Sequence, residues 1–382
     1  TMYKNLARKG LNPVDREFFA QAKGLELQNG QLVAFGMTGR VGIRAEDDDG
    51  LQALLRSETG IITIFGKSWM LHVKEALRTT GAKNIDTIGN TVNFLREQGR
   101  RVFYDAEHFF DGFKDNPEYA LETLETAKQN GAEVIILCDT NGGSTPEFVY
   151  DATRAVREKL GEDYPLGIHV HNDSGLAVAS SLAAVKAGAT QVQGTINGAG
   201  ERTGNVDFCV FLPTANFKYG IDIGDIDLQG ITNLSRYVEL ENGLVVPHNA
   251  PYVGDNAFRH KGGVHVSAVR RNPRAYEHID PSVVGQKTSF EHSDQGGGAN
   301  VLEMAEKHGF PLTANDPEYR ILVDRMKEMK DLGDAQEFLL LHEVLTHEGE
   351  PFKLLRSKAT TDEGSNPEEY VSPTAHVIVQ IG

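Results

Sequence analysis

The chain has few cysteines, no excess of positive charge and no long apolar run. Its 382 residues include only two cysteines, Cys138 and Cys209, so the sequence excludes a disulfide framework and fits a reducing compartment. Thirty-eight basic residues stand against 54 acidic ones, and the net charge of −16 argues against binding to the phosphates of nucleic acid. An acidic total still allows one local basic pocket for an anionic substrate.

Hydrophobic segments are short throughout the chain. None approaches the ~20 residues needed to cross a bilayer, and residues 1–9 contain no apolar core like that of a signal peptide. We therefore expect a cytoplasmic protein with no membrane partner. The hydrophobic share of 40% and the charged share of 24% are those of a globular protein. The length allows a barrel of about 250 residues together with an appendage.

The first half of the chain repeats a short apolar run, a polar loop and an amphipathic helical stretch. This alternation predicts βαβ units and a parallel sheet. Polar residues follow each run, at the carboxyl ends of the predicted strands, which favours a (β/α)8 barrel, an α/β fold, over a doubly wound sheet with one switch point. The predicted strands are Gln31–Gly36, Ile61–Gly66, Arg101–Asp105, Glu133–Cys138, Leu166–Val170 and Thr190–Thr195.

Six such units fall short of the eight that close a barrel. Residues 1–30 contain one predicted helix, Pro13–Ala22, and no convincing strand. We therefore expect a TIM barrel that lacks its first two strands. Helices between the strands are predicted at Glu118–Asn130, Pro146–Leu160 and Ser174–Ala187.

The pattern changes to helices and loops from about residue 221. We predict three regions: an incomplete barrel with the catalytic residues over 1–220, helical linker subdomains over 221–334, and the start of an α+β regulatory domain over 335–382. Within the last two regions, the pattern predicts helices near Ile231–Glu241, Asn300–His308 and Pro317–Leu332, and a final strand at Ala375–Gly382.

The segment Leu166–Asp173 (LGIHVHND) is the most informative stretch of the chain. It begins as a buried strand, and His169 and His171 stand two residues apart. Side chains at i and i+2 of a strand point to the same face, so both imidazoles converge where the strand ends. Two neutral imidazoles suit a divalent metal. The alternative is a pair of histidines that nearby carboxylates satisfy in a polar loop.

Two further polar residues follow predicted strands. Glu107 is flanked by aromatic residues that lower the local dielectric constant, which raises a carboxyl pKa and suits a general base. Thr140 precedes a glycine turn and is placed to hold a substrate carboxylate. The alternatives are a loop or helix-capping role for Glu107 and capping of the helix at Pro146 for Thr140.

Two more motifs lie further along the chain. The glycine-rich loop Gly194–Asn205 contains Glu201 and Arg202, and its cationic side chain and free backbone N–H groups suit an anionic substrate or a thioester carrier. Beyond the predicted barrel, His265 lies in a His/Gly-rich segment and Tyr276 follows it. A His with a Tyr at this spacing is suited to proton transfer, and the alternative is a packed interfacial histidine.

Taken together and in this order, these strings resemble the metal-dependent Claisen-condensing acyltransferases, namely the 2-isopropylmalate, homocitrate and citramalate synthases. The strings FGKSW and YDAEHFFDG are most similar to the citramalate synthase branch, which joins acetyl-CoA to pyruvate to give (R)-citramalate and CoA on the route to isoleucine. The main matching segments are Asn12–Phe19, Thr63–His72, Tyr104–Gly112, Leu137–Gly143, Gly167–Leu176, Gln191–Asn205, Pro251–Ala268 and Tyr276–Gly285.

The resemblance implies a divalent metal, Mg²⁺, Mn²⁺ or Zn²⁺, with His169 and His171 as ligands and Asn205 beside it. The metal of such an enzyme chelates the 2-oxo acid and polarises its carbonyl group. Acetyl-CoA is then the co-substrate, and Glu107 would help to remove its methyl proton. Water finally cleaves the CoA ester.

The resemblance also implies the remaining substrate contacts. His72 and Thr140 would hold the 2-oxo acid, and Glu201 and Arg202 are assigned to substrate binding. The catalytic residues His265 and Tyr276 would reach into the barrel of a partner subunit, which implies a homodimer.

The sequence departs from the family in two places. The family's opening strand carries Asp-Thr-Thr-Leu-Arg-Asp-Gly, which supplies a third metal ligand and an arginine for the substrate, and this chain has no such string. Relatives have Ser-Gly-Arg where this chain has Gly296, Gly297 and Gly298. We therefore expect a chain shortened at both ends, with little or no synthase activity by itself, because catalytic metals usually have three protein ligands.

Three alternatives remain open at this point. One is a 2-isopropylmalate synthase that uses 2-oxoisovalerate in leucine biosynthesis. Another is a non-catalytic paralogue that acts as a binding or regulatory subunit. The last is a metal-dependent aldolase or lyase on the same barrel, which the segment with His265 and Tyr276 disfavours.

Overall fold

The computed structural model describes residues 13–290, 298–328, 334–346, 352–360 and 374–381, which form two units divided between Pro247 and His248. The strands of the first unit are β1 (Val33–Met37), β2 (Ile61–Lys67), β3 (Arg101–Glu107), β4 (Val134–Asp139), β5 (Leu166–Val170) and β6 (Gln191–Gln193). Its helices are α1 (Pro13–Ala22), α2 (Asp49–Arg56), α3 (Met70–Glu75), α4 (Gly81–Glu97), α5 (Phe109–Asp115), α6 (Pro117–Gln129), α7 (Pro146–Leu160), α8 (Ala177–Lys186), α9 (Phe208–Tyr219) and α10 (Ile231–Asn242).

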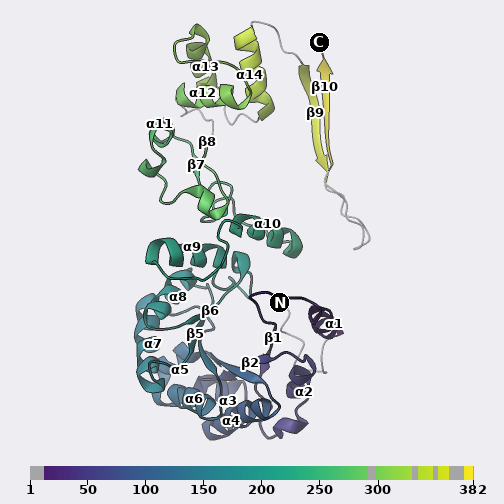
Figure 1. The fold of residues 1–382 in the computed structure, drawn as a ribbon, viewed down its shortest axis with the longest axis vertical. Helices are drawn as coiled ribbons and strands as arrows, with labels where there is room; N and C mark the ends of the chain where they lie inside the picture. Colours follow the sequence, from purple (N-terminus) through teal and green to yellow (C-terminus); the bar gives the residue numbers. More distant parts are fainter. Residues whose placement is uncertain (1–12, 291–297, 329–333, 347–351, 361–373, 382) are drawn as a thin grey trace. The chain divides into compact units, whose positions relative to one another are not determined.

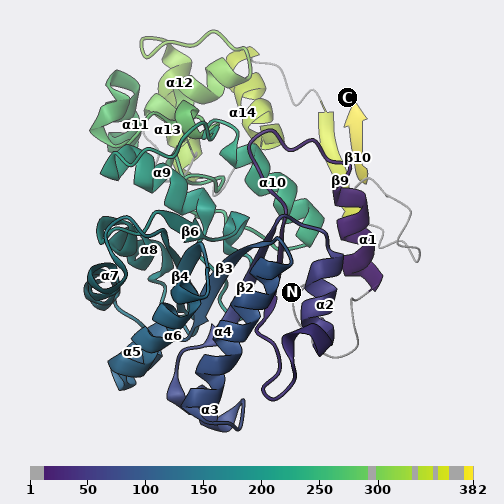
Figure 2. The ribbon, with the colours of Figure 1, turned by 60° about the horizontal axis from the view of Figure 1, so that its bottom comes forward.

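The six strands of the first unit form one parallel sheet in the order β1-β2-β3-β4-β5-β6, which curves as it twists (Figure 1, Figure 2). Every strand pairs with its neighbour in sequence, as in βαβ units that wind in one direction. Within the described residues β1 and β6 are the edges of this sheet. The predicted α/β fold with a parallel, barrel-type sheet is confirmed.

The two faces of the sheet differ sharply in composition. On one face, the alternate residues Ile62, Ile64, Tyr104, Leu137 and Ile168 are fully buried under the helices and belong to one hydrophobic core. The other face carries polar and charged side chains, because successive residues of a strand point to opposite sides. The helices cover the first face, and the polar side chains Asp105, Cys138 and His169 lie on the opposite face, where Asp105 and Cys138 are buried.

Polar side chains begin most of the helices that cover the sheet. Thr80 caps α4, Asn116 caps α6 and Asp207 caps α9, each by accepting a hydrogen bond from a backbone N–H of the first turn. Pro117 follows Asn116 at the first position of α6, where the missing N–H costs nothing. These caps fix where each helix begins.

The predicted strand Thr190–Thr195 is shorter in the structure, where β6 has three residues. The chain leaves the sheet at Gly194, where an added Cβ would lie 2.8 Å from the carbonyl oxygen of Val206. Thr195 N donates to this same Val206 carbonyl oxygen at 2.9 Å. The end of the predicted strand therefore pairs with the following loop instead of with β5.

The second unit is described by itself. Its elements are β7 (Arg259–His260), α11 (Gly263–Arg271), β8 (Ser289–Phe290), α12 (Gly298–Lys307), α13 (Pro317–Glu328), α14 (Asp334–Thr346), β9 (Phe352–Thr360) and β10 (Thr374–Ile381). Helices α12, α13 and α14 share a small core that includes Met304, Leu322 and Leu341. Strands β9 and β10 form an antiparallel pair.

The predicted helices and final strand of the second unit are present with slightly different bounds. Gly296 and Gly297, and residues 1–12, lie outside the described residues. The division into three regions at 220 and 334 stays a prediction. None of the helices in the described ranges combines the length and the apolar character that a membrane span needs.

Gly112 in α5 offers a test of how tightly the helices pack on the loops that follow the strands. A Cβ at this position would overlap the carbonyl oxygen of Ser68, just after β2. We expect Gly112→Ala to destabilise the first unit by about 1–3 kcal/mol, the usual cost of overpacking, although alanine is the better helix former. The measurement is urea unfolding followed by the fluorescence of Trp69, the chain's only tryptophan.

Gly60→Ala is the matched control, because nothing lies within 4 Å of a Cβ added there. An unchanged or higher unfolding midpoint for Gly112→Ala would show that the loop at Ser68 yields without cost.

Candidate active site

Most of the predicted site residues lie where β2 to β6 end, along the carboxyl-terminal end of the sheet. We call this end the polar edge, as distinct from the lateral edges formed by β1 and β6. In the register of the sheet, Lys67 pairs with Glu107 across β2 and β3, and Cys138 pairs with His169 across β4 and β5. His171 continues β5 and forms an isolated bridge with Asn205. This arrangement follows from parallel pairing, since the ends of parallel strands meet at the same edge.

His169 has a polar partner at each ring nitrogen. Its Nδ1 lies 3.4 Å from Asp105 Oδ2, and its Nε2 lies 3.0 Å from Asn205 Oδ1. Burial lowers the pKa of His169, but the hydrogen bond and the charge of Asp105 outweigh it, so the pKa is raised. The resemblance implied Asn205 beside a metal held by His169 and His171, and in the structure Asn205 contacts His169. The metal-binding role of these residues stays a prediction.

The contact between His169 and Asn205 joins two hydrogen-bond acceptors whenever Nδ1 of the histidine carries the ring proton. Asn205 Nδ2 donates to the carbonyl oxygen of Ala199 at 3.1 Å, which turns its Oδ1 toward the histidine. Gly200 permits this approach, because a Cβ there would overlap the Asn205 amide. Two lone pairs 3.0 Å apart repel each other unless a cation or a proton lies between them.

His171 lies beside His169, with ring centroids 5.2 Å apart and an interplanar angle of 21°. Its Nδ1 is buried and has no hydrogen-bond partner among the residues that the structure describes. Burial, together with the charge of His169, lowers the pKa of His171 to about 4, so the ring is neutral at pH 7. Both rings therefore lie on the same side, as predicted. The alternative was that nearby carboxylates bind both histidines, and in the structure a carboxylate contacts His169.

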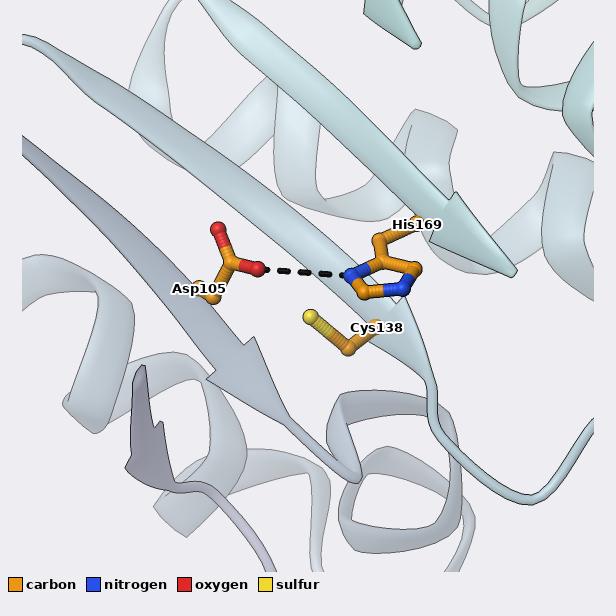
Figure 3. Close-up of side chains that lie close together, drawn as sticks. All are labelled: Asp105, Cys138 and His169. Carbon is orange, nitrogen blue, oxygen red and sulfur yellow. Dashed lines mark hydrogen bonds and ion pairs between the residues drawn. The ribbon is translucent and has the colours of Figure 1, made fainter. Parts of the chain in front are cut away.

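Asp105, Cys138 and His169 form a compact group whose ligand atoms all lie within 4.8 Å of one another (Figure 3). Asp105 and Cys138 are not among the site residues predicted from the sequence. The signal for Asp105 was present, because it stands two residues before Glu107 on one strand and so shares its face. Burial raises the pKa of the Cys138 thiol well above its usual value, and the nearby Asp105 adds to this effect.

Glu107 forms an ion pair with Lys67, with Nζ and Oε2 2.5 Å apart and both side chains mostly buried. The pair lies at the ends of β2 and β3. Glu107 caps no helix, because α5 begins after His108, which has a left-handed φ of 57°. The capping alternative is therefore excluded, and Glu107 is a carboxylate held by a cation. Sequence reasoning had not selected Lys67.

His72 lies in a small aromatic cluster at the start of α3. Its ring centroid is 4.2 Å from that of His108 and 5.3 Å from the Trp69 ring. Nδ1 of His72 is buried, and no described part of the chain supplies it with a hydrogen-bond partner. Burial lowers its pKa, and the positive charges of His108 and Lys67 lower it further. His72 therefore presents a neutral ring.

Thr140 connects the ends of β3 and β4 to the glycine-rich loop. Its Oγ1 accepts the backbone N–H of His108 at 2.8 Å, and its carbonyl oxygen accepts from Arg202 Nη2 at 2.6 Å. The cap of α7 is Thr145 instead, which accepts from the N–H of Phe148. The capping alternative for Thr140 is therefore excluded.

Arg202 is held in place by Asp173 in a bidentate pair, with N–O distances of 2.8 and 3.0 Å. The hydrogen bond from Arg202 holds the pKa of Asp173 below its usual value. Glu201 lies next to it, with its carboxylate 3.9 Å from Arg202 Nη1. The loop is thus built around one cation that two carboxylates partly neutralise.

His265 and Tyr276 belong to the second unit and lie together there. Their ring centroids are 4.1 Å apart, and the rings stack at 28°. Tyr276 remains 45% exposed. Behind it Glu277 is buried, and its Oε1 accepts from Thr288 Oγ1 at 2.6 Å. The structure therefore pairs the two residues that the sequence analysis selected outside the barrel.

Comparison with known proteins gives the family. A family model described as HMGL-like matches residues 34–238, which contain the sheet and its polar edge. The chain belongs to the HMGL-like family. A second model, described as homocitrate synthase post-HMGL domain-like, matches residues 252–334, which contain His265 and Tyr276.

Curated HMGL-like relatives are named (R)-citramalate synthase. The protein of Aquifex aeolicus is 46% identical over 84% of this chain and 61% of its own length, and that of Synechocystis sp. is 48% identical over 85% and 60%. The protein of Geobacter sulfurreducens is 41% identical over 98% of this chain and 71% of its own length. The chain thus spans about three fifths of the length of the first two relatives.

Solved structures of HMGL-like proteins share the fold. The HMG-CoA lyase of Bacillus subtilis superposes with a TM-score of 0.52 at 17% identity, over 62% of this chain and 78% of that chain. The hydroxymethylglutaryl-CoA lyase of Pseudomonas aeruginosa gives 0.52 at 18% identity, over 61% and 76%. At such identity, the likeness supports the barrel-type fold alone.

The lowered pKa of His72 predicts how the stability of the first unit depends on pH. The unfolded chain protonates this histidine near its ordinary pKa of 6.5, whereas the folded chain does so only at lower pH. Acidification below 6.5 therefore favours unfolding, until the pH passes below the folded pKa as well. We expect the urea midpoint of His72→Gln to fall less below pH 6.5 than that of the wild type.

Unfolding followed by Trp69 fluorescence at several pH values measures this difference. His248→Gln is the control, because the side chain of His248 is 77% exposed and lies in the second unit. Parallel pH profiles for His72→Gln and the wild type would contradict the role assigned to burial.

Proposed function

We propose that this chain carries the site of an acyltransferase that condenses acetyl-CoA with pyruvate to give (R)-citramalate and CoA. The observation that carries the proposal is the convergence of His169, His171 and Asn205 with the Glu107–Lys67 pair at one edge of a parallel sheet. Three relatives named (R)-citramalate synthase, at 41–48% identity, support the choice of reaction.

The donor set fits a divalent metal. His169 Nε2 and Asn205 Oδ1 face each other as acceptors, and the neutral ring of His171 has a buried nitrogen without a partner. Two imidazoles and an amide oxygen suit Zn²⁺, Mn²⁺ or Mg²⁺ in decreasing order of nitrogen preference. When bound, such a metal supplies Lewis acidity to the carbonyl group of a 2-oxo acid.

Glu107 is proposed as the residue that removes a methyl proton from acetyl-CoA. Lys67 holds the carboxylate in place at 2.5 Å, and the partly buried setting excludes most of the water that would otherwise solvate the carboxylate. The carbanion formed attacks the keto carbon of pyruvate. Water then cleaves the thioester, and the CoA thiol leaves.

The remaining polar residues of the edge are proposed to bind substrates. The neutral His72 contacts the ring of His108, and Thr140 accepts the backbone N–H of His108; both would receive the 2-oxo acid. Arg202 is proposed to bind an anionic substrate through its guanidinium group, in competition with Asp173 and with Glu201 beside it. His265 and Tyr276 are proposed to complete the proton transfers from a partner subunit, which makes a homodimer part of the proposal.

Two other functions remain as outcomes of the test. A 2-isopropylmalate synthase of Methanopyrus kandleri, named as probable, is 32% identical over 74% of this chain, so 2-oxoisovalerate is the alternative substrate. A binding or regulatory subunit without turnover is the other alternative. A cytoplasmic location, small-molecule substrates, the absence of nucleic acid binding and a regulatory role for residues 335–382 belong to the same proposal.

The release of CoA thiol from acetyl-CoA tests the reaction, with pyruvate or 2-oxoisovalerate as the acceptor and with Mn²⁺ present or chelated. We expect a low rate for this chain, because its three proposed metal ligands are all neutral. The rate should depend on the metal and on pyruvate. Release with 2-oxoisovalerate alone would move the assignment to the isopropylmalate branch, and no release with either acid would favour a non-catalytic subunit.

Glu107→Gln tests the proton abstraction. We expect it to lower the rate of thiol release by about 10²–10⁴-fold, the usual contribution of a general base, while Mn²⁺ binding by calorimetry stays unchanged. The matched control is Glu133→Gln, which breaks a similar ion pair, that with Arg101 at 2.7 Å, beside the opposite ends of the strands. Equal rates for the two variants would remove Glu107 from the reaction.

A further inference from the structure

Asp105 is a buried carboxylate on the face of the sheet opposite the helices, and the proposed function gives it no role. Its side chain is 2% exposed. Oδ1 accepts a hydrogen bond from Gln193 Nε2 at 3.0 Å, and Oδ2 lies 3.4 Å from His169 Nδ1. Both oxygens of the carboxylate are thus engaged, one with β6 and one with β5. Burial of a charge costs free energy unless hydrogen bonds or opposite charges compensate for the lost solvation.

The contact between Asp105 and Nδ1 of His169 determines whether Nε2, on the other side of the ring, carries a proton or a lone pair. A neutral imidazole carries one proton, and a carboxylate at Nδ1 holds that proton there. The lone pair then lies on Nε2, which faces Asn205 Oδ1 at 3.0 Å. The Asn205 amide cannot relieve the conflict by turning, because its nitrogen is bonded to the carbonyl oxygen of Ala199.

We infer that Asp105 is a positioning residue that fixes the tautomer and the direction of His169, so that Nε2 is presented to a divalent cation between His169 and Asn205. Gln193 orients Asp105 in turn. This inference rests on the proposed function, since it assumes that the site takes a metal. Carboxylates that accept the second ring N–H of a metal-binding histidine are a general feature of metal sites.

The competing arrangement has the metal on the other side of the ring, with Asp105, Cys138 and His169 as direct ligands (Figure 3). Two observations disfavour it. Both oxygens of Asp105 already have partners, and the Cys138 thiol is buried, with its Sγ directed to the carbonyl oxygen of Ile136 at 3.7 Å. A thiol must lose its proton to ligate, and burial beside carboxylates opposes this.

Titration of the whole chain with Mn²⁺ alone, followed by calorimetry, tests the inference without any need for turnover. We expect Asp105→Asn to weaken Mn²⁺ binding about 10–100-fold, the usual effect of removing such a partner of a ligand. Gln193→Leu, which removes the hydrogen bond from Gln193 Nε2 to the carboxylate, should have a smaller effect in the same direction. Asp105→Glu should restore part of the affinity if the charge is what matters.

Asp139→Asn is the matched control, because Asp139 is equally buried on the neighbouring strand but its carboxylate accepts hydrogen bonds from the backbone N–H and the hydroxyl group of Ser144. It should bind Mn²⁺ like the wild type. Circular dichroism and Trp69 fluorescence identify any variant that fails to fold, and Gln193→Leu then carries the test. Unchanged Mn²⁺ affinity in folded Asp105→Asn and Gln193→Leu overturns the inference and leaves the proposed function intact.

Co²⁺ spectra and Cys138→Ala separate a positioning role from direct ligation. For a positioning role, Cys138→Ala binds Mn²⁺ normally, and Co²⁺ gives no charge-transfer band from a thiolate. A thiolate band in the near ultraviolet, lost in Cys138→Ala together with affinity, makes Asp105 a ligand and overturns the inference. A wild-type chain that binds neither Mn²⁺ nor Co²⁺ overturns it together with the metal-dependent function.

Discussion

The alternation of side chains along parallel strands is the constraint on which the rest of this structure depends. Because successive residues point to opposite faces, one row of each strand supplies the core under the helices and the other row remains for chemistry. Ile64 and Phe65, or Ala106 and Glu107, are neighbours in sequence but belong to different environments. Parallel pairing then gathers the last residues of each strand at one edge, where His169 and Glu107 both lie.

The polar edge combines neutral imidazole rings with a few charged side chains. Burial keeps His72 and His171 neutral, whereas the charge of Asp105 raises the pKa of His169. Lys67 and Glu107 balance each other at 2.5 Å. Such a site has little net charge of its own, yet it presents lone pairs at His169, His171 and Asn205. A site that presents lone pairs and has little net charge binds a cation more readily than it binds an anion in the absence of that cation.

Site geometry could be predicted from the sequence where the physical rule involves only residues that are close together in the chain. The two-residue spacing of His169 and His171 was enough to predict that their rings share one side, because strand geometry depends only on neighbours. The same rule applied to Glu107 would have found Asp105, which was missed. Lys67 and Gln193 were missed for a different reason: their partners lie 40 and 88 residues away in the chain. No local pattern predicts which side chains meet across strands.

By itself, the sequence determined the strands, the parallel sheet, the polar edge and the family, because apolar periodicity and motif spacing are properties of local segments. Only the tertiary structure decided which acceptor faces which ring nitrogen, that Thr140 bonds His108 instead of capping α7, and that His265 stacks on Tyr276. Those contacts depend on distances between segments that loops bring together. Burial sets their protonation states, and burial exists only once the chain has packed.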